Sequence, residues 1–102
     1  MSVKALYQQK RMSAADAIRV VKNGDTIVVP TAVAEPPALL TALSEARRDF
    51  KGVQISQILP VRKYAYVDPE TQENVRHTAY FFSGVTRAGG AEGWVDFIPA
   101  YF

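Results

Sequence analysis

The chain has 102 residues, of which 48% are hydrophobic and 22% charged, and a formal net charge of +2, so it has the size and composition of one small globular domain. It contains no cysteine, which excludes disulfides, thiolate metal sites and cysteine nucleophiles. Its twelve basic residues occur singly or in pairs rather than in one cluster, so we expect no nucleic-acid partner.

The chain carries no signal for export, membrane insertion or metal binding. Residues 1–12 lack an apolar segment of signal-peptide length, and no run approaches the ~20 apolar residues of a membrane span. We therefore expect a cytoplasmic protein without membrane contacts. One histidine and scattered carboxylates lack metal-ligand spacing, and no phosphate-loop pattern occurs, so neither a metal nor a permanently bound cofactor is expected.

A helix and a buried strand are predicted first. Ser13 is a favourable N-cap, and Asp16 at the third helical position places a carboxylate where the helix dipole favours it. Gly24 gives this helix its C-terminal stop. The β-branched run at 26–29 then indicates a strand buried in the core.

A loop and a second helix follow this strand. The loop has no large side chain before Glu35, and Pro36 then opens an apolar-periodic helix to about Arg48, because proline in the first turn removes no helical hydrogen bond. The expected apolar face of this helix consists of Leu39, Leu43, Ala46 and Phe50. A strand that enters a helix N-terminus through a tight loop is how α/β proteins build small-molecule sites.

The second half predicts three strands and one weak helix. The strands are expected at 53–59, 78–82 and 95–98, with a long loop at 60–76, and Val53, Ile55 and Gln57 share one strand face. Two adjacent glycines weaken the helix at 85–92. Strands that alternate with helices favour one α/β domain over 1–102, an open, mostly parallel sheet with helices on both faces.

Seven short motifs lie in order along the chain. They are Ser13-Ala14-x-x-Ala17, Gly24-Asp25, Glu35-Pro36-x-Ala38-Leu39-Leu40-x-Ala42-Leu43, Ile58-Leu59-Pro60, Tyr66-x-Asp68-Pro69, Arg76-His77 and Glu92-Gly93-x-x-Asp96-Phe97-Ile98-Pro99. Any one of them is weak, but together they resemble the N-terminal part of the acetyl-CoA hydrolase/transferase family, which includes 4-hydroxybutyrate CoA-transferase.

The resemblance implies a CoA-transferase-like N-terminal domain, incomplete over 1–102 and part of a larger two-domain enzyme; the apolar end at 98–102 agrees with this. It implies transfer of CoA from an acyl-CoA to a small carboxylate, or thioester hydrolysis. The nucleophilic glutamate belongs to the second domain, so this chain holds no catalytic residue and is expected to be inactive alone. The expected partners are the acyl-CoA, the carboxylate and the C-terminal domain, in a homo-oligomer.

The resemblance also places the acyl and oxyanion pocket in the loop after the first strand. Val33, Ala34, Glu35 and Pro36 are the candidates, because a tetrahedral oxyanion needs preorganised donors and a helix N-terminus supplies N–H groups. Relatives usually have glycines in this loop, whereas 31–34 contains none, and alanine adopts a positive φ only at a cost. The oxyanion geometry is therefore in question.

Four of the candidate residues have a simpler interpretation. Glu35 contacts substrate or orients the loop, or it is a charge that the dipole of the second helix favours. Ser83 and Gly84 follow the strand at 78–82 and line the same pocket, or they form a plain turn. Arg87 steers an anionic CoA or carboxylate, or it is a solvated helix residue.

Three further polar residues are better explained without a site. His77 is the only histidine and has no partner motif, so it is expected at the surface or in a hydrogen bond. Asp68 and Glu70 resemble paired carboxylates, but in a proline-containing loop such residues cap turns.

A second function is an alternative, a non-catalytic half-domain that binds CoA or acts as a scaffold for a partner subunit. The missing nucleophile and the missing loop glycines motivate it. Calorimetric titration with CoA, acyl-CoA and short carboxylates discriminates the two functions.

Overall fold

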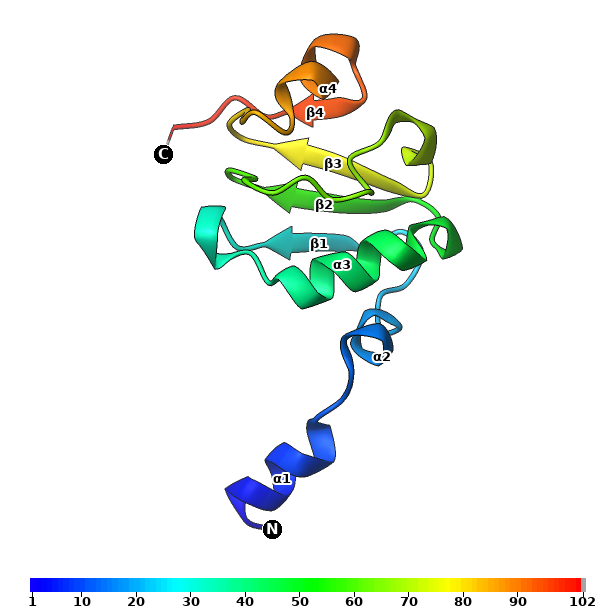
Figure 1. Cartoon of the computed structure of the whole chain (residues 1–102), viewed down its shortest axis with the longest axis vertical. Helices are drawn as coiled ribbons and strands as arrows, with labels where there is room; N and C mark the ends of the chain where they lie inside the picture. The colour runs from blue at the N-terminus through cyan, green and yellow to red at the C-terminus, as the bar shows by residue number, and fades with distance from the viewer. Residues whose placement is uncertain (102) are drawn as a thin grey trace.

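The computed structural model describes residues 1–101 and shows a four-stranded parallel sheet (Figure 1). The strands, in spatial and sequence order, are β1 (Thr26–Val29), β2 (Val53–Gln57), β3 (Val75–Ala79) and β4 (Val95–Phe97). Each neighbouring pair is parallel, with Ile27 opposite Ile55, Ile55 opposite His77, and His77 opposite Val95. The predicted α/β class and parallel sheet are confirmed.

Two helices precede the first strand, and the other helical segments lie in the connections between strands. They are α1 (Val3–Lys10), α2 (Ala14–Ile18), α3 (Pro37–Ala46) and α4 (Arg87–Glu92), with short 3-10 helices η1 (Ala32–Ala34), η2 (Arg47–Asp49) and η3 (Pro69–Thr71). The hydroxyl of Ser13 caps α2 by accepting the N–H of Asp16 at 3.1 Å, as predicted. Helix α2 nevertheless ends at Ile18 rather than near Gly24, because the Asp25 carboxylate accepts the N–H of Lys22 at 2.8 Å and closes a turn there.

Helix α1 is absent from the predicted elements. It is capped by Ser2, whose hydroxyl accepts the N–H of Ala5 at 3.1 Å, and it buries no residue. Figure 1 shows it standing away from the sheet, at the end of the molecule opposite β4. Its start therefore depends on a local cap rather than on a core-facing apolar stripe.

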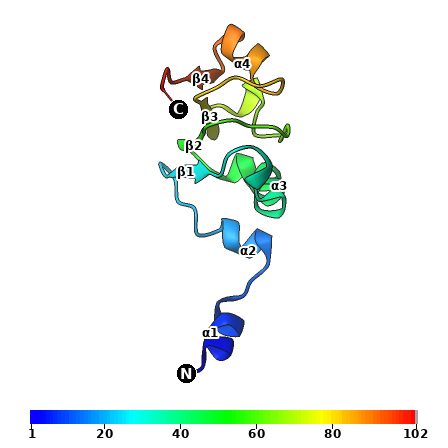
Figure 2. The same cartoon turned by 90° about the vertical axis from the view of Figure 1, so that its left-hand side faces the viewer.

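Helices and loops cover one face of the sheet, and the other face is open (Figure 2). Side chains alternate accordingly along β2, where Val53, Ile55 and Gln57 are buried and Gln54 is exposed. On β1, Val28 is 78% exposed. The prediction of helices on both faces therefore holds for one face only within residues 1–101.

The core lies between the covered face, α3 and the loop after β2. Leu40 and Leu43 of α3 are buried in it, whereas Leu39 is 38% exposed, so the predicted helix face is wrong at Leu39. The reason is the helix start, since Pro37 is the first helical residue and the inward stripe centres on Leu40 and Leu43. Tyr64 of the loop supplies a buried ring to the same core.

The third strand lies three residues before its predicted position. The aromatic run 80–82 resembles a strand, but the paired residues are Val75–Ala79, and Phe82 packs beside the ring of Phe97 at 5.0 Å. A Cβ at Gly90 would lie 2.2 Å from the Phe82 ring, so this glycine allows α4 to approach the aromatic side chain closely. The glycines that weaken α4 locally are therefore required by its packing.

Candidate functional site

The predicted site residues lie at the carboxyl edge of the sheet. The loop with η1 leaves β1 there, the segment 58–62 leaves β2, and the turn at 83–84 follows β3. Because all four strands are parallel, these three connections share one edge, which Figure 1 shows at the left of the sheet. Ligand sites of open α/β sheets form at this edge.

Two hydrogen bonds join the loop after β1 to the loop after β2. The N–H of Ala32 donates to the carbonyl of Leu59 at 2.9 Å. The Oε1 atom of Glu35 accepts the N–H of Val61, also at 2.9 Å. Glu35 is buried although its loop is at the surface. It therefore orients the loop, one of the roles expected for it, while its contact with a substrate stays a prediction.

Gln57, at the end of β2, connects the segment after β1 to the middle of β3 through one buried amide. Its Nε2 donates to Glu35 Oε1 at 2.7 Å and to the carbonyl of Pro30 at 3.3 Å. Both partners are acceptors, so the amide oxygen must face the other way, toward His77 Nε2 at 3.3 Å. Because the Gln57 oxygen can only accept, His77 Nε2 must donate, and the His77 ring is therefore the tautomer protonated on Nε2.

His77 is fully buried on β3, so the hydrogen-bonded interpretation is confirmed and the surface interpretation is wrong. Burial lowers its pKa to about 4, and the ring is therefore neutral at pH 7. Its Nδ1 atom is buried and meets no hydrogen-bond partner in the described part of the chain. The centroid of the Tyr66 ring lies 6.0 Å from that of the His77 ring. The pKa of the Tyr66 hydroxyl is raised, mainly by burial and further by the nearby charge of Glu35.

The turn η1 contains a left-handed alanine. Ala32 has φ +52°, a region in which an L-residue other than glycine is strained. Although the loop at 31–34 contains no glycine, one of its residues, Ala32, adopts a positive φ. At the tip of the turn, the side chain of Val33 is 97% exposed.

The donors of this turn are mostly occupied. The N–H of Ala34 donates to Thr31 and the N–H of Glu35 to Ala32, at 3.1 and 3.2 Å. Pro36 has no N–H. The N–H of Val33 donates to no group within residues 1–101. Among the four candidate residues of the loop, Val33 is thus the one with a free backbone donor.

Two cavities open at the carboxyl edge. The smaller, of about 220 Å³, lies between η1 and the loop after β2, with Val33, Glu35 and Arg62 among its lining residues. Arg62 is exposed and forms no ion pair with any of residues 1–101. The larger, of about 510 Å³, lies toward the open face and is lined by residues including Val28 and Tyr80.

Ala34 and Pro36, the turn at 83–84 and Arg87 line neither of these cavities. The N–H of Ser83 donates to the hydroxyl of buried Thr86 at 3.0 Å, and the Ser83 carbonyl accepts the N–H of Arg87 at the same distance. This pattern is that of a turn entering α4. Arg87 is exposed at the first position of α4. Their predicted roles in the pocket stay predictions.

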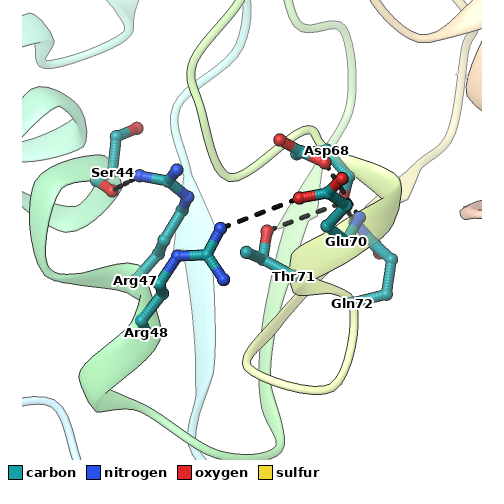
Figure 3. A network of polar contacts seen from close by, with 7 residues as sticks. All are labelled: Ser44, Arg47, Arg48, Asp68, Glu70, Thr71 and Gln72. Atoms are coloured by element: carbon teal, nitrogen blue, oxygen red, sulfur yellow. Dashed lines mark hydrogen bonds and ion pairs between the residues drawn. The ribbon is translucent and has the colours of Figure 1, made fainter.

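The two carboxylates at 68 and 70 belong to the segment that leads into the start of β3, which places them at the amino edge of the parallel sheet. Figure 3 shows their contacts. The Asp68 carboxylate accepts the N–H of Glu70 at 2.8 Å and caps η3, so turn capping is confirmed for Asp68 alone. Glu70 faces Arg48 at 3.9 Å in an exposed ion pair. No group of three His, Cys, Asp or Glu residues within 1–101 could hold a metal ion, and no helix there is long and apolar enough to cross a membrane.

Gln57 and Arg62 were not among the predicted site residues. The available signal for Gln57 was a polar side chain on the inward face of an otherwise apolar strand. Its partners lie 20 to 27 residues away in the sequence, so only the fold brings them together.

Comparison with known proteins finds similarity along the whole chain. The acetyl-CoA hydrolase/transferase N-terminal domain matches residues 1–102. The succinyl-CoA:cyclohexane-1-carboxylate CoA transferase of Geobacter metallireducens is 35% identical over 99 residues, covering 94% of this chain and 22% of that protein. The 4-hydroxybutyrate coenzyme A transferase of Clostridium kluyveri is 29% identical over 102 residues, covering 100% and 24%.

A solved structure is similar over the same span. The crystal structure of RipA from Yersinia pestis matches with a TM-score of 0.83 and 25% identity, covering 100% of this chain and 26% of that chain. The chain thus spans about a quarter of the length of these three relatives.

Proposed function

The chain belongs to the acetyl-CoA hydrolase/transferase family through its N-terminal domain, and from this premise we propose that its carboxyl edge forms one wall of an acyl-CoA site in a larger enzyme. The reaction is transfer of CoA from an acyl-CoA to a small carboxylate, with thioester hydrolysis as the variant in which water accepts the acyl group. The names of two relatives, both CoA transferases, support transfer.

The observation that carries this proposal is the strained turn at the end of β1. Ala32 is held at φ +52°, and the adjacent Val33, whose N–H is unpaired within residues 1–101, is one of the residues that line the smaller cavity. A preorganised donor that is free in the ground state suits the oxygen of a thioester carbonyl as it gains charge. One such donor contributes on the order of 10²–10³ in kcat in acyl-transfer enzymes.

The nucleophile comes from outside this chain. Glu35 already accepts two hydrogen bonds, and Asp68 and Glu70 lie at the opposite edge. In the proposed reaction, a glutamate of the second domain attacks the thioester carbonyl. The C–S bond breaks, CoA departs as a thiolate, and a mixed anhydride of the glutamate and the acyl group remains. The thiolate then attacks the glutamyl carbonyl, which releases the acyl group as a carboxylate and leaves a glutamyl-CoA thioester.

The test uses the full-length protein that contains this chain. It is incubated with acyl-CoA, the covalent intermediate is trapped with hydroxylamine or reduced with borohydride, and the modified residue is mapped. We expect one modified glutamate outside residues 1–102. An enzyme that turns over acyl-CoA without any modified glutamate would contradict the proposed reaction. Calorimetric binding of CoA without turnover would instead favour the non-catalytic half-domain, which the absence of glycine at 31–34 supports.

A further inference from the structure

We propose that Gln57 is the positioning residue of this site, whose buried amide holds the turn of Ala32 and Val33 in place from the end of β2. Its catalytic consequence rests on the proposed function, whereas the hydrogen-bond arrangement does not.

The amide of Gln57 is fully used. Both of its donors and its acceptor have partners, and its side chain is 2% exposed. The acceptors Glu35 and Pro30 fix the direction of the NH₂ group, and His77 receives the oxygen on the other side. An apolar side chain of equal size would leave the buried imidazole N–H of His77 without its partner, and it would remove one hydrogen bond from the Pro30 carbonyl and one of the two from the Glu35 carboxylate.

The two acceptors bracket the strained turn. Pro30 lies two residues before Ala32, and Glu35 lies three residues after it. Gln57 therefore fixes both ends of a segment whose middle residue has the left-handed φ of +52°. Strained backbone persists only where surrounding contacts determine it, so loss of these contacts lets the turn relax. The Val33 N–H would then move away from its position at the cavity.

Glu35 takes part as an acceptor in this arrangement. One oxygen, Oε1, accepts from both Gln57 Nε2 and the N–H of Val61. A glutamine at position 35 offers a carbonyl oxygen at the same place and can keep both bonds. An alanine there can keep neither. A role in positioning therefore distinguishes Glu35→Gln from Glu35→Ala, whereas a role that needs the charge treats the two alike.

The variant that tests the proposal is Gln57→Met in the full-length enzyme, with Gln54→Met as its matched control. Gln54 belongs to the same strand but points to the open face, and it forms none of these side-chain hydrogen bonds. We expect Gln57→Met to lower kcat on the order of 10²-fold with little change in KM, because a displacement of about 1 Å costs that much. Gln54→Met should change neither constant.

Amide hydrogen exchange and rescue supply the readouts that a simple loss of packing would not give. The amides of Ala32 and Val61 should exchange faster in folded Gln57→Met, although their own acceptors are retained. Glu35→Gln should keep Val61 protected and retain at least roughly ten times the kcat of Glu35→Ala. Native kcat with native exchange in Gln57→Met would overturn the proposal, and so would a raised KM at native kcat.

A measurement on the unsubstituted protein keeps the proposal falsifiable if Gln57→Met does not fold. Nitrogen-15 NMR of the imidazole should show His77 protonated on Nε2 at pH 7, because the Gln57 oxygen accepts there. Protonation on Nδ1 would reverse the amide and overturn the proposal. If the enzyme shows no CoA transfer, the proposed function fails, while the tautomer and exchange data still decide the role of Gln57 in holding the turn.

Discussion

Replacement of Ala32 by glycine should stabilise the protein, which is the reverse of the usual effect of glycine. Ala32 has φ +52°, and the left-handed conformation costs an L-residue about 1–2 kcal/mol. Glycine avoids this strain but loses about 0.5–1 kcal/mol through the greater freedom of the unfolded chain. Ala32 is half-buried, so removal of its methyl group forfeits a further few tenths of a kcal/mol, roughly half of a buried CH₂. The expected net gain is about 0.5 kcal/mol.

Ala34→Gly is the matched control. Ala34 belongs to the same turn, is exposed, and does not have a positive φ. It has no strain to release, so the glycine should destabilise by about 0.5–1 kcal/mol. The two variants should therefore differ by about 1–1.5 kcal/mol in the free energy of unfolding, which corresponds to several degrees in Tm for a domain of this size.

The assay is urea unfolding followed by circular dichroism, with both variants and the parent measured under the same conditions. Equal slopes and midpoints shifted in opposite directions would support the strained turn. If Ala32→Gly destabilises as much as Ala34→Gly, then Ala32 is not strained in the protein. The turn would then store no strain that could hold a preorganised donor in place.

Three further predictions concern other parts of the structure. The pKa of His77 is lowered to about 4 in the folded state, below its usual 6.5, so the unfolded state binds more protons between these values. The free energy of unfolding should thus fall as pH decreases from 6.5 to 4, by about 1.4 kcal/mol per pH unit from this group. In His77→Gln, the dependence of the urea midpoint on pH should be flatter over this range. An unchanged dependence would contradict the neutral buried ring. Gly90→Ala should destabilise the protein by about 1–3 kcal/mol, because its Cβ would meet the Phe82 ring. At Gly84 an added Cβ has no atom within 4 Å, so Gly84→Ala should change the free energy of unfolding by less than about 0.5 kcal/mol. Similar urea midpoints for the two variants would rule out this packing. Glu70→Ala, which removes one exposed ion pair, should shift the free energy of unfolding by less than about 1 kcal/mol, and a larger loss in thermal unfolding would show that the pair is not merely a surface contact.

Local chemistry was sufficient for several elements of the fold. The β-branched run at 26–29 forms β1 with the predicted bounds, and Ser13 caps α2 as predicted. The aromatic run 80–82 misled the prediction of β3, since strand propensity alone cannot separate a paired residue from one that packs in the following loop. Helix α1 depends on the Ser2 cap without a buried face, so no core-facing pattern indicated it.

The candidate site was predicted at the level of loops but not of its contacts. The edge of the sheet and the turn at 31–35 follow from the order of strands and helices, and the cost of alanine there follows from backbone sterics. Gln57 could not be assigned from the sequence, because its role depends on Glu35 in the loop after β1 and on His77 in β3, which only the fold brings to it. A polar residue on a buried strand face was the one local sign.

Photoaffinity mapping with an acyl-CoA that carries a photoreactive acyl chain shows whether the turn at 31–35 lies against the acyl group. The full-length protein is labelled, digested and sequenced, with unlabelled acyl-CoA as competitor. We expect competed labelling within residues 31–35, beside the smaller cavity that Val33 and Glu35 line. Labelling confined to the larger cavity, around Val28 and Tyr80, or none within residues 1–102, would contradict the claim that this turn faces the reacting acyl group.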